Sequence, residues 1–358
     1  MKKTAFIGPL PPPLGGVAMI NQSFQNLNFN GYDITVFNTS NNSLSEDLYR
    51  GFPWGNIGKE ISKIKRLSDF LNSTKPDVVN IFITSGYSII RDLFYLRMLY
   101  RKNIPIVIHF HSKTKGEFAL TPNRLKLLSK FFNKYAKKII LLSEHHYSFF
   151  VKYFGSKKCE VIENFVSYEH FNNEIVNKTN DFLYVGRLSK EKGFFDLLKA
   201  VKILKDNKVV CRIQVIGVAP TIEVEKRIND IISANHLEDY FVFNGATFGE
   251  SKYTLFKQSS CLIFPSHLEN SPVVLKEAIA AKLAIIASDI DANQLILKAE
   301  KNHYLHQVTC PDSLAVIIEK LLGDSDVMKA FCKASESIKD YDKSIAREKL
   351  LNLMDNLC

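Results

Sequence analysis

Short apolar runs alternate with longer amphipathic segments along nearly the whole of this 358-residue chain. This alternation is typical of repeated strand–helix–strand units, which build a parallel sheet covered by helices. The expected strands lie at 4–8, 34–37, 77–83, 104–110, 138–142, 159–162, 181–186, 210–216, 240–243, 260–264 and 284–288. The pattern therefore predicts an α/β protein with doubly wound sheets, and the chain is long enough for two cores.

A polar stretch from Asn164 to Asn180 interrupts the pattern and contains five asparagines without a sustained apolar period. Such a segment is typical of an interdomain linker. We therefore expect an N-terminal Rossmann-like domain over 1–168 and a second one over 169–335. The last segment, 336–358, is expected to form a helix that returns to the first domain. Ligands of doubly wound sheets bind at the carboxyl ends of strands, so motifs that directly follow strands are the candidate site residues.

The net charge of +10 is concentrated in the first domain. Residues 1–168 hold 23 Lys and Arg against 11 Asp and Glu, whereas the remainder has 24 against 26. An imbalance of this kind indicates an anionic partner for the first domain. No groove-reading motif accompanies the charge, so we expect no nucleic acid.

The cysteine pattern and the apolar runs bear on the compartment. Six cysteines are scattered singly, without CxxC spacing, which favours reduced thiols in the cytoplasm and no structural zinc. No apolar run approaches the roughly 18 residues of a membrane-spanning helix. The apolar start of the chain ends at Pro9 and is expected to form a first strand, not a secretory leader.

Two motifs in the first domain follow expected strands. The Gly/Pro-rich turn after the first strand contains Gly15 and Gly16, where backbone N–H groups could approach an anion or a sugar. It lacks the GxGxxG spacing of dinucleotide-binding proteins, and an ordinary loop is the alternative. The strand at 104–110 leads into His109 and His111, which share a face if the strand continues. His111 is the candidate for a sugar or phosphate contact, the alternative being one buried and one exposed histidine.

Two cations follow the first strand of the second domain. Arg187 and Lys192 lie in one loop between the strand ending at Gly186 and a helix expected to begin near Phe194. A guanidinium grips a diphosphate in bidentate fashion, and an ammonium adds a compact charge. This loop predicts a diphosphate site, and a solvated basic turn is the alternative.

The segment after the strand at 260–264 carries two carboxylates. Ser271 and Pro272 are expected to be the N-cap and the first residue of a helix, which leaves Glu269 in the preceding loop. Glu277 then lies inside the helix on a small, apolar face. A buried carboxylate needs partners, which ribose hydroxyls or a structural salt bridge could supply.

Residues 181–288 resemble the donor half of the family 4 retaining glycosyltransferases, which have the GT-B fold of two facing Rossmann-like domains with a cleft between them. The resemblance rests on the Gly-Arg-Leu…Lys-Gly run and on the spacing of Glu269 and Glu277. It implies that Arg187 and Lys192 hold the donor diphosphate and that Glu277 binds the ribose. It also implies that Glu269 binds the transferred sugar together with backbone N–H groups of Asn270 to Val273.

The resemblance also implies an activity and its remaining residues. The chain is expected to be a metal-independent hexosyltransferase that uses a nucleoside-diphosphate sugar with retention and needs no cofactor. Gly15 and Gly16 are expected to approach the phosphate, and His111 is expected to approach the reacting carbon. The expected catalytic residues are therefore His111, Glu269, Arg187 and Lys192. The acceptor is expected to be a glycan or a polyprenyl-diphosphate-linked glycan of surface polysaccharide, O-antigen, lipopolysaccharide or capsule.

Three alternatives remain open. Asp289 and Asp291 form a DxD sequence that could hold a metal ion, as in the other major transferase fold. A nucleotide-sugar 2-epimerase would use the same donor site without an acceptor. A non-catalytic assembly subunit would account for Lys282 and Asp291-Ala292, which stand where the family usually has glycines.

A basic helix is expected from Thr121-Pro122 to about Lys138, where six basic side chains and no acidic one occur. Lys126, Lys130, Lys134 and Lys137 follow one face of this helix, beside an apolar stripe of Leu125, Leu128, Phe132 and Tyr135. The pattern fits a helix lying on the anionic inner face of the plasma membrane. The alternative is a core-packed helix with a solvated basic side.

Overall fold

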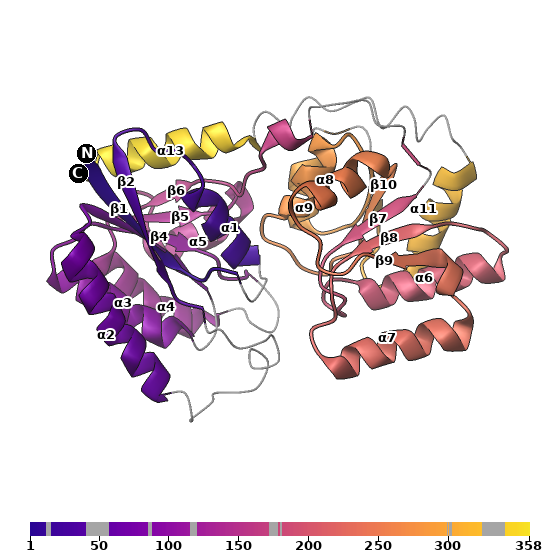
Figure 1. The fold of residues 1–358 in the computed structure, drawn as a ribbon, viewed down its shortest axis with the longest axis horizontal. Coiled ribbons are helices and arrows are strands. Elements are labelled where there is room, and N and C mark those ends of the chain that lie inside the picture. Colours follow the sequence, from indigo (N-terminus) through magenta and orange to yellow (C-terminus); the bar gives the residue numbers. More distant parts are fainter. Residues whose placement is uncertain are drawn as a thin grey trace. The chain divides into compact units, whose positions relative to one another are not determined.

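The computed structural model describes residues 1–11, 16–40, 57–84, 88–114, 120–171, 178–179, 181–298, 300, 303–323 and 341–358 (Figure 1). The chain divides into two compact units. Unit 1 consists of Met1–Asn164 and Ser344–Cys358, and unit 2 consists of Phe165–Lys343. The first boundary thus lies close to the expected end at 168, and the last helix belongs to unit 1.

Unit 1 contains a six-stranded sheet in the order β2-β1-β3-β4-β5-β6, and every neighbouring pair is parallel. The strands are β1 (Lys2–Gly8), β2 (Tyr32–Asn38), β3 (Val78–Ile83), β4 (Ile106–Phe110), β5 (Lys138–Leu141) and β6 (Cys159–Val161). The helices are α1 (Gly16–Gln25), α2 (Ile57–Thr74), α3 (Ser88–Arg101), α4 (Pro122–Tyr135), α5 (Glu144–Phe154) and α13 (Lys343–Asp355). Figure 1 shows α2, α3 and α4 together on one side of this sheet and α13 on the other.

Unit 2 contains a second six-stranded parallel sheet, in the order β12-β11-β10-β7-β8-β9. The strands are β7 (Phe182–Val185), β8 (Ile213–Ile216), β9 (Phe241–Phe243), β10 (Cys261–Phe264), β11 (Ala284–Ser288) and β12 (His303–His306). The helices are α6 (Phe194–Asp206), α7 (Ile222–Asn235), α8 (Gly249–Gln258), α9 (Val273–Ala280), α10 (Asp291–Leu297) and α11 (Pro311–Gly323), with 3-10 turns η3 (Tyr168–His170) and η4 (Glu238–Tyr240). The chain runs outward from β7 to β9 and then returns to β10 beside β7. The direction of winding therefore reverses between β7 and β10, where doubly wound folds bind ligands.

Two helix starts test the expected caps. The Thr121 hydroxyl accepts a hydrogen bond from the Arg124 N–H at 3.4 Å, and Pro122 is the first residue of α4, as predicted. The predicted start of α9 is wrong by one residue, because Pro272 is the N-cap and the helix begins at Val273. The Ser271 hydroxyl accepts a hydrogen bond from the buried Lys276 ammonium at 3.1 Å.

The end of α9 explains the lysine at a usual glycine position. Lys282 has a φ of 55°, in the left-handed region. The Lys282 N–H donates to the Ile279 carbonyl and the Leu283 N–H to the Ala278 carbonyl, both at 3.0 Å. These two bonds define a Schellman motif, whose left-handed residue is most often glycine. Lysine takes the same conformation here without changing the backbone hydrogen bonds.

The returning helix α13 completes the core of unit 1 (Figure 1). Leu350, Leu353 and Met354 are buried on its inner side. The Met354 sulfur accepts a hydrogen bond from the Asn80 amide at 3.3 Å and one from the Thr4 hydroxyl at 3.6 Å. The last residues of the chain thus contact β1 and β3 of the same unit. Among the described residues, no helix is long and apolar enough to cross a membrane.

Candidate functional site

The loops after β7 and β10 meet at the winding reversal in unit 2. Lys192, at the end of the first loop, places its ammonium 2.5 Å from the Oε1 atom of Glu269 in the second. The same oxygen accepts a hydrogen bond from the Ser266 hydroxyl at 2.7 Å. Arg187 belongs to the first loop and is exposed. The structure therefore brings together one expected cation and one expected carboxylate, with the second cation in the same loop.

Backbone contacts hold these two loops together. The His267 N–H donates to the Glu191 carbonyl at 2.9 Å, and the Ser266 hydroxyl approaches the same oxygen at 3.4 Å. Gly193 has a φ of 69°, and a Cβ at this position would lie 2.0 Å from the Pro265 carbonyl oxygen. Since a side chain cannot fit there, glycine is required for this close approach. The charged groups thus sit on a preorganised pair of loops.

A side-chain contact between His267 and Asp196 supports the second loop. The His267 Nε2 atom lies 2.6 Å from the Asp196 Oδ2 atom, and Asp196 is in the first turn of α6. Sequence reasoning did not single out either residue. The two residues are 71 positions apart in the chain, so the sequence alone does not predict their contact. The one signal was a histidine two residues before Glu269.

Glu277 is buried on α9, as predicted, but it has a cationic partner. Its Oε1 atom lies 2.6 Å from the Lys252 ammonium of α8, and the two side chains are 9% and 19% exposed. This realises the salt bridge that was the alternative interpretation for this residue. The Oε2 atom is buried and has no hydrogen-bond partner among the described residues. One oxygen of a buried carboxylate therefore remains available to a hydroxyl donor.

Lys276 was missed by the sequence analysis, although it precedes Glu277. Its side chain is fully buried, and its ammonium lies 4.1 Å from the centre of the Tyr341 ring. Because the same ammonium holds the Ser271 hydroxyl, it fixes the short loop between Glu269 and α9. In the sequence, only the positive charge of Lys276 near the start of the expected helix pointed to this role.

In unit 1, the glycine-rich turn precedes α1, which begins at Gly16. Among the described residues, no atom lies within 4 Å of a Cβ at Gly16. Gly15 lies outside the described residues. Gly8 is the tighter position, since a Cβ there would come within 2.8 Å of the Phe82 Cβ atom.

His109 and His111 lie on the same side of the chain, because both rings stack on Phe82. The His109 Nε2 atom lies 3.1 Å from the Asn80 side-chain oxygen within the core, as in the structural interpretation of this residue. His111 follows the end of β4 and is 9% exposed. Burial, with a smaller effect of the neighbouring His146, lowers the pKa of His111 to about 3. The ring is therefore neutral at pH 7, and its Nε2 atom has no hydrogen-bond partner among the described residues.

His146 supports the loop that follows His111 and was not predicted. Its Nδ1 atom accepts from the Leu142 N–H at 3.3 Å, and its Nε2 atom lies 2.9 Å from the Ser112 carbonyl oxygen. Burial lowers the pKa of His146 to about 4, although the bond to Ser112 acts in the opposite direction. A neutral ring with Nε2–H satisfies both contacts.

The DxD segment follows β11. The Asp289 carboxylate accepts a hydrogen bond from the Gln294 amide at 2.5 Å. Within the described part of the chain, no three His, Cys, Asp or Glu side chains are placed to hold a metal ion.

Comparison with protein families gives two matches that follow the two units closely. The model described as "Glycosyltransferase Family 4" matches residues 16–170. The model described as "Glycosyl transferases group 1" matches residues 167–338.

Individual proteins agree with these matches. The chain is 22% identical over 360 residues to the amylovoran biosynthesis glycosyltransferase AmsD of Erwinia amylovora, covering 95% of this chain and 96% of AmsD. It is 27% identical over 179 residues to the phosphatidyl-myo-inositol mannosyltransferase of Mycolicibacterium smegmatis, covering 49% of this chain and 45% of that protein. The crystal structure of Anabaena HepE in complex with UDP and glucose superposes with a TM-score of 0.77 at 14% identity, over 99% of this chain and 100% of HepE. That likeness establishes the two-domain α/β GT-B fold.

Proposed function

The chain belongs to the family 4 glycosyltransferases, and we propose that it transfers a sugar from a nucleoside-diphosphate sugar to a glycan or lipid-linked acceptor. The observation that carries this proposal is the buried Oε2 atom of Glu277, which has no hydrogen-bond partner among the described residues. A ribose hydroxyl that donates to this oxygen would remove an unsatisfied buried acceptor, which is unfavourable in a folded protein.

The charges on the two loops support a role in stabilising the leaving diphosphate. Arg187 and Lys192 supply fixed positive charge at the carboxyl end of β7, where negative charge develops as the sugar leaves. We therefore expect transfer without a metal ion, because these cations would supply the positive charge that a Lewis acid otherwise provides. Glu269 is held by Lys192 and Ser266, which suits a residue that positions the sugar. We propose retention at the anomeric carbon, with Glu269 and Glu277 acting as binding groups and not as a hydrolase pair.

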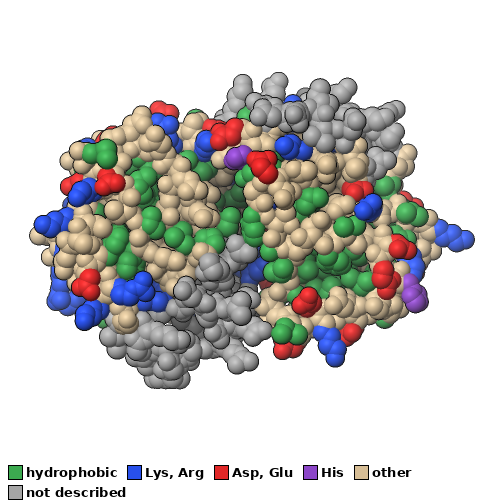
Figure 2. Space-filling model, in the orientation of Figure 1, with side chains coloured by type: hydrophobic (Ala, Val, Ile, Leu, Met, Phe, Trp, Pro, Cys, Tyr) green, Lys and Arg blue, Asp and Glu red, His purple; other side chains and the backbone are tan. Residues whose placement is uncertain are grey.

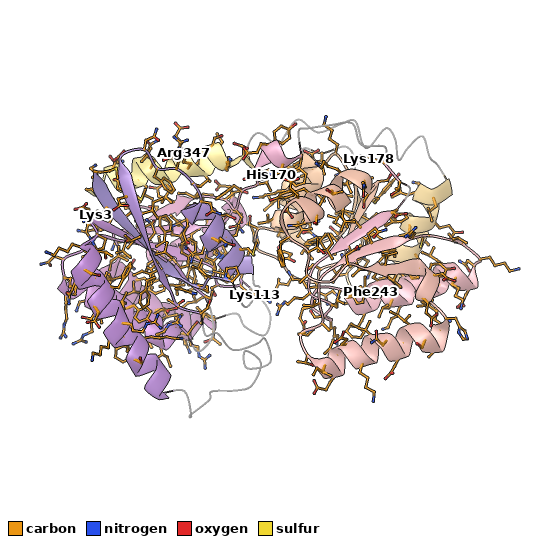
Figure 3. All side chains as sticks on the ribbon, in the orientation of Figure 1. Lys3, Lys113, His170, Lys178, Phe243 and Arg347 are labelled. Carbon is orange, nitrogen blue, oxygen red and sulfur yellow. The ribbon has the colours of Figure 1, made fainter. Side chains whose placement is uncertain are left out.

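Unit 1 would contribute His111 and the turn at Gly15 and Gly16. A neutral His111 with a free Nε2 atom can accept or donate one hydrogen bond to a sugar hydroxyl. No described atom crowds a Cβ at Gly16, which supports close approach of a phosphate to the start of α1. Phe243, labelled in Figure 3 at the end of the edge strand β9, is 45% exposed.

The relatives support a place in surface polysaccharide assembly. AmsD is named for amylovoran biosynthesis, and the mycobacterial relative is named for a phosphatidylinositol acceptor. A polyprenyl-diphosphate-linked acceptor would bring the chain to the inner face of the plasma membrane. The basic unit 1 would then face the anionic lipids. This finer assignment of substrate and place is part of the proposal.

Thermal-shift measurements with UDP-, GDP-, ADP- and TDP-sugars, each with and without EDTA, test the donor site. A donor at ten times its dissociation constant stabilises the fold by about 1.4 kcal/mol, which raises the melting temperature by a few degrees. We expect one nucleotide class to give an EDTA-insensitive shift that Glu277→Ala abolishes. Glu225→Ala, at an exposed site on α7, is the control that keeps the shift.

The alternatives predict different outcomes. A non-catalytic subunit would give no shift with any nucleotide sugar. An epimerase would change the donor sugar when no acceptor is present. Once a donor is known, proton NMR of the product gives the anomeric configuration, and an inverted product would refute retention.

A further inference from the structure

The outer face of two neighbouring helices in unit 1 exposes large apolar side chains among cations. Ile90 and Phe94 on α3 are 53% and 55% exposed, and Leu127 on α4 is 56% exposed. Isolated exposed apolar residues are ordinary on protein surfaces. These three lie on one helical layer of unit 1, and that placement calls for an explanation.

Helix geometry sets what α3 presents outward. Its buried side chains, Asp92, Tyr95, Leu96 and Leu99, form one stripe. The opposite stripe has helical spacing and is exposed throughout, and it consists of Ile90, Phe94, Arg97 and Arg101. The outer side of α3 is therefore half aromatic or aliphatic and half guanidinium.

Helix α4 presents a similar stripe, which corrects an expectation. The apolar stripe that was expected beside the basic face, Leu125, Leu128, Phe132 and Tyr135, is buried in the core of unit 1. The core-packed alternative therefore holds for those residues. The exposed outer side carries Lys126, Leu127, Lys130 and Lys134.

The two outer stripes form one surface. Strands β3 and β4 are adjacent and parallel, so the helices that follow them lie on the same face of the sheet. The rings of Tyr100 on α3 and Tyr135 on α4 lie 5.1 Å apart, which confirms that the helices touch. We name the eight outward residues of these stripes the α3–α4 surface. On the side of unit 1 where Figure 1 shows α2 and α3, Figure 2 shows scattered Lys and Arg side chains, with Asp or Glu and hydrophobic side chains among them.

The charge on this surface has one sign. Within Ser88–Arg101 and Pro122–Tyr135, which the structure describes in full, the only carboxylate is that of Asp92. Asp92 is 2% exposed and is bound by Arg91 at 2.8 Å. Five cations of the α3–α4 surface thus face outward without an acidic neighbour on either helix.

We propose that the α3–α4 surface docks unit 1 on an anionic lipid leaflet. Phe94, Ile90 and Leu127 enter the boundary between headgroups and acyl chains, while the five cations contact lipid phosphates. This inference deepens the membrane-facing part of the proposed function, and it adds apolar insertion through α3 to a purely electrostatic attraction. It requires nothing of the donor site in unit 2.

Vesicle flotation of the full chain tests the surface, with phosphatidylcholine vesicles and with vesicles that contain 30% phosphatidylglycerol. Each cation near the surface contributes about fivefold to partitioning. Lys126→Gln/Lys130→Gln/Lys134→Gln should therefore lose about a hundredfold in binding to the anionic vesicles. The matched control, Lys199→Gln/Lys226→Gln/Lys298→Gln, removes three exposed lysines of unit 2 and should bind as the parent chain does.

Insertion has its own readout. In a chain whose one native tryptophan is removed by Trp54→Phe, tryptophan emission of Phe94→Trp should shift to the blue with anionic vesicles and be quenched by brominated acyl chains. Val316→Trp, at a position on α11 that is 64% exposed, should show neither effect. Equal binding to both kinds of vesicle, or a Phe94→Trp signal that brominated lipid leaves unchanged, would overturn the proposal.

A protein partner is the competing occupant. If sedimentation velocity shows a dimer that Phe94→Ser dissolves, and vesicles bind none of the chain, the surface is a contact between copies and the proposal is wrong. Thermal shifts with nucleotide sugars on the same variants separate this failure from a failure of the donor site, since neither surface variant touches unit 2.

Discussion

Lys252 and Glu277 are more deeply buried than most ion pairs, and this predicts their response to substitution. Lys252→Met leaves the Glu277 carboxylate buried without a cation, which should lower the free energy of unfolding by about 3–5 kcal/mol. Adding Glu277→Gln removes the stranded charge and should restore part of that loss. Urea unfolding of the parent, both single variants and the double variant measures the coupling.

The control is an exposed pair in the same unit. Lys202 and Asp206 are 49% and 58% exposed, so Lys202→Met should cost less than about 1 kcal/mol. Equal losses from Lys252→Met and Lys202→Met would contradict the assignment of Lys252 as the partner of a buried charge.

Lys282 offers a gain in stability. Its φ of 55° costs a non-glycine residue roughly 1–2 kcal/mol, which glycine does not incur. Lys282→Gly should therefore raise the free energy of unfolding by about 1 kcal/mol and leave the Schellman hydrogen bonds intact. Thermal unfolding compared with Lys282→Ala, which keeps the strain, is the measurement. A lower melting temperature for the glycine variant would refute this account.

Single residues of the site were predictable where a charged side chain directly follows an expected strand. Lys192 and Glu269 follow strands that meet at the winding reversal, so their proximity could be expected from topology. Lys252 could not be found this way, because it belongs to a helix with no motif of its own. Only the packing of α8 on unit 2 brings its ammonium to Glu277.

At the scale of elements, the end of β4 and the start of α5 carry three buried histidines with lowered pKa values. Burial lowers the pKa of His111 to about 3, that of His146 to about 4 and that of His109 well below 6.5. Below pH 6.5 the unfolded chain binds more protons than the folded one, so stability falls as the pH decreases. The loss should approach about 1.4 kcal/mol per pH unit for each histidine between pH 6 and 5.

Urea unfolding at pH 7.5, 6 and 5 tests this dependence. The glutamine of His146→Gln can still accept from Leu142 and donate to Ser112, but it cannot be protonated. The free energy of unfolding should therefore fall with decreasing pH by the contribution of one histidine less than in the parent chain. If the free energy of unfolding depended on pH as steeply as in the parent chain, His146 would not contribute to that dependence.

Most strands and helices were predictable, because the spacing of apolar residues along the sequence differs between strands and helices. β12 was missed, since His303-Tyr-Leu-His306 has too few apolar residues to be distinguished from a loop. The start of α9 was misplaced by one residue, because serine followed by proline is typical of an N-cap and a first helical residue, whereas here Pro272 is the N-cap.

At the scale of the molecule, α13 is expected to govern the stability of unit 1. Met354 is fully buried against Thr4 and Asn80, so Met354→Ala should cost about 2–5 kcal/mol. The loss should affect the unfolding of unit 1 and spare that of unit 2, which has its own core. Differential scanning calorimetry should show this as a shift of one transition. Ile345→Ala, at a position that is 39% exposed, is the control with little effect.

The chain passes from unit 1 to unit 2 between Asn164 and Phe165 and returns between Lys343 and Ser344. Unit 2 is thus an uninterrupted insertion, whereas unit 1 is assembled from two distant stretches. During synthesis, unit 2 has all its strands once residue 306 has left the ribosome, while unit 1 still lacks α13. The half of the molecule that is translated first should therefore be the last to reach its final stability, and until then the polar groups of Thr4 and Asn80 lack their contact with Met354.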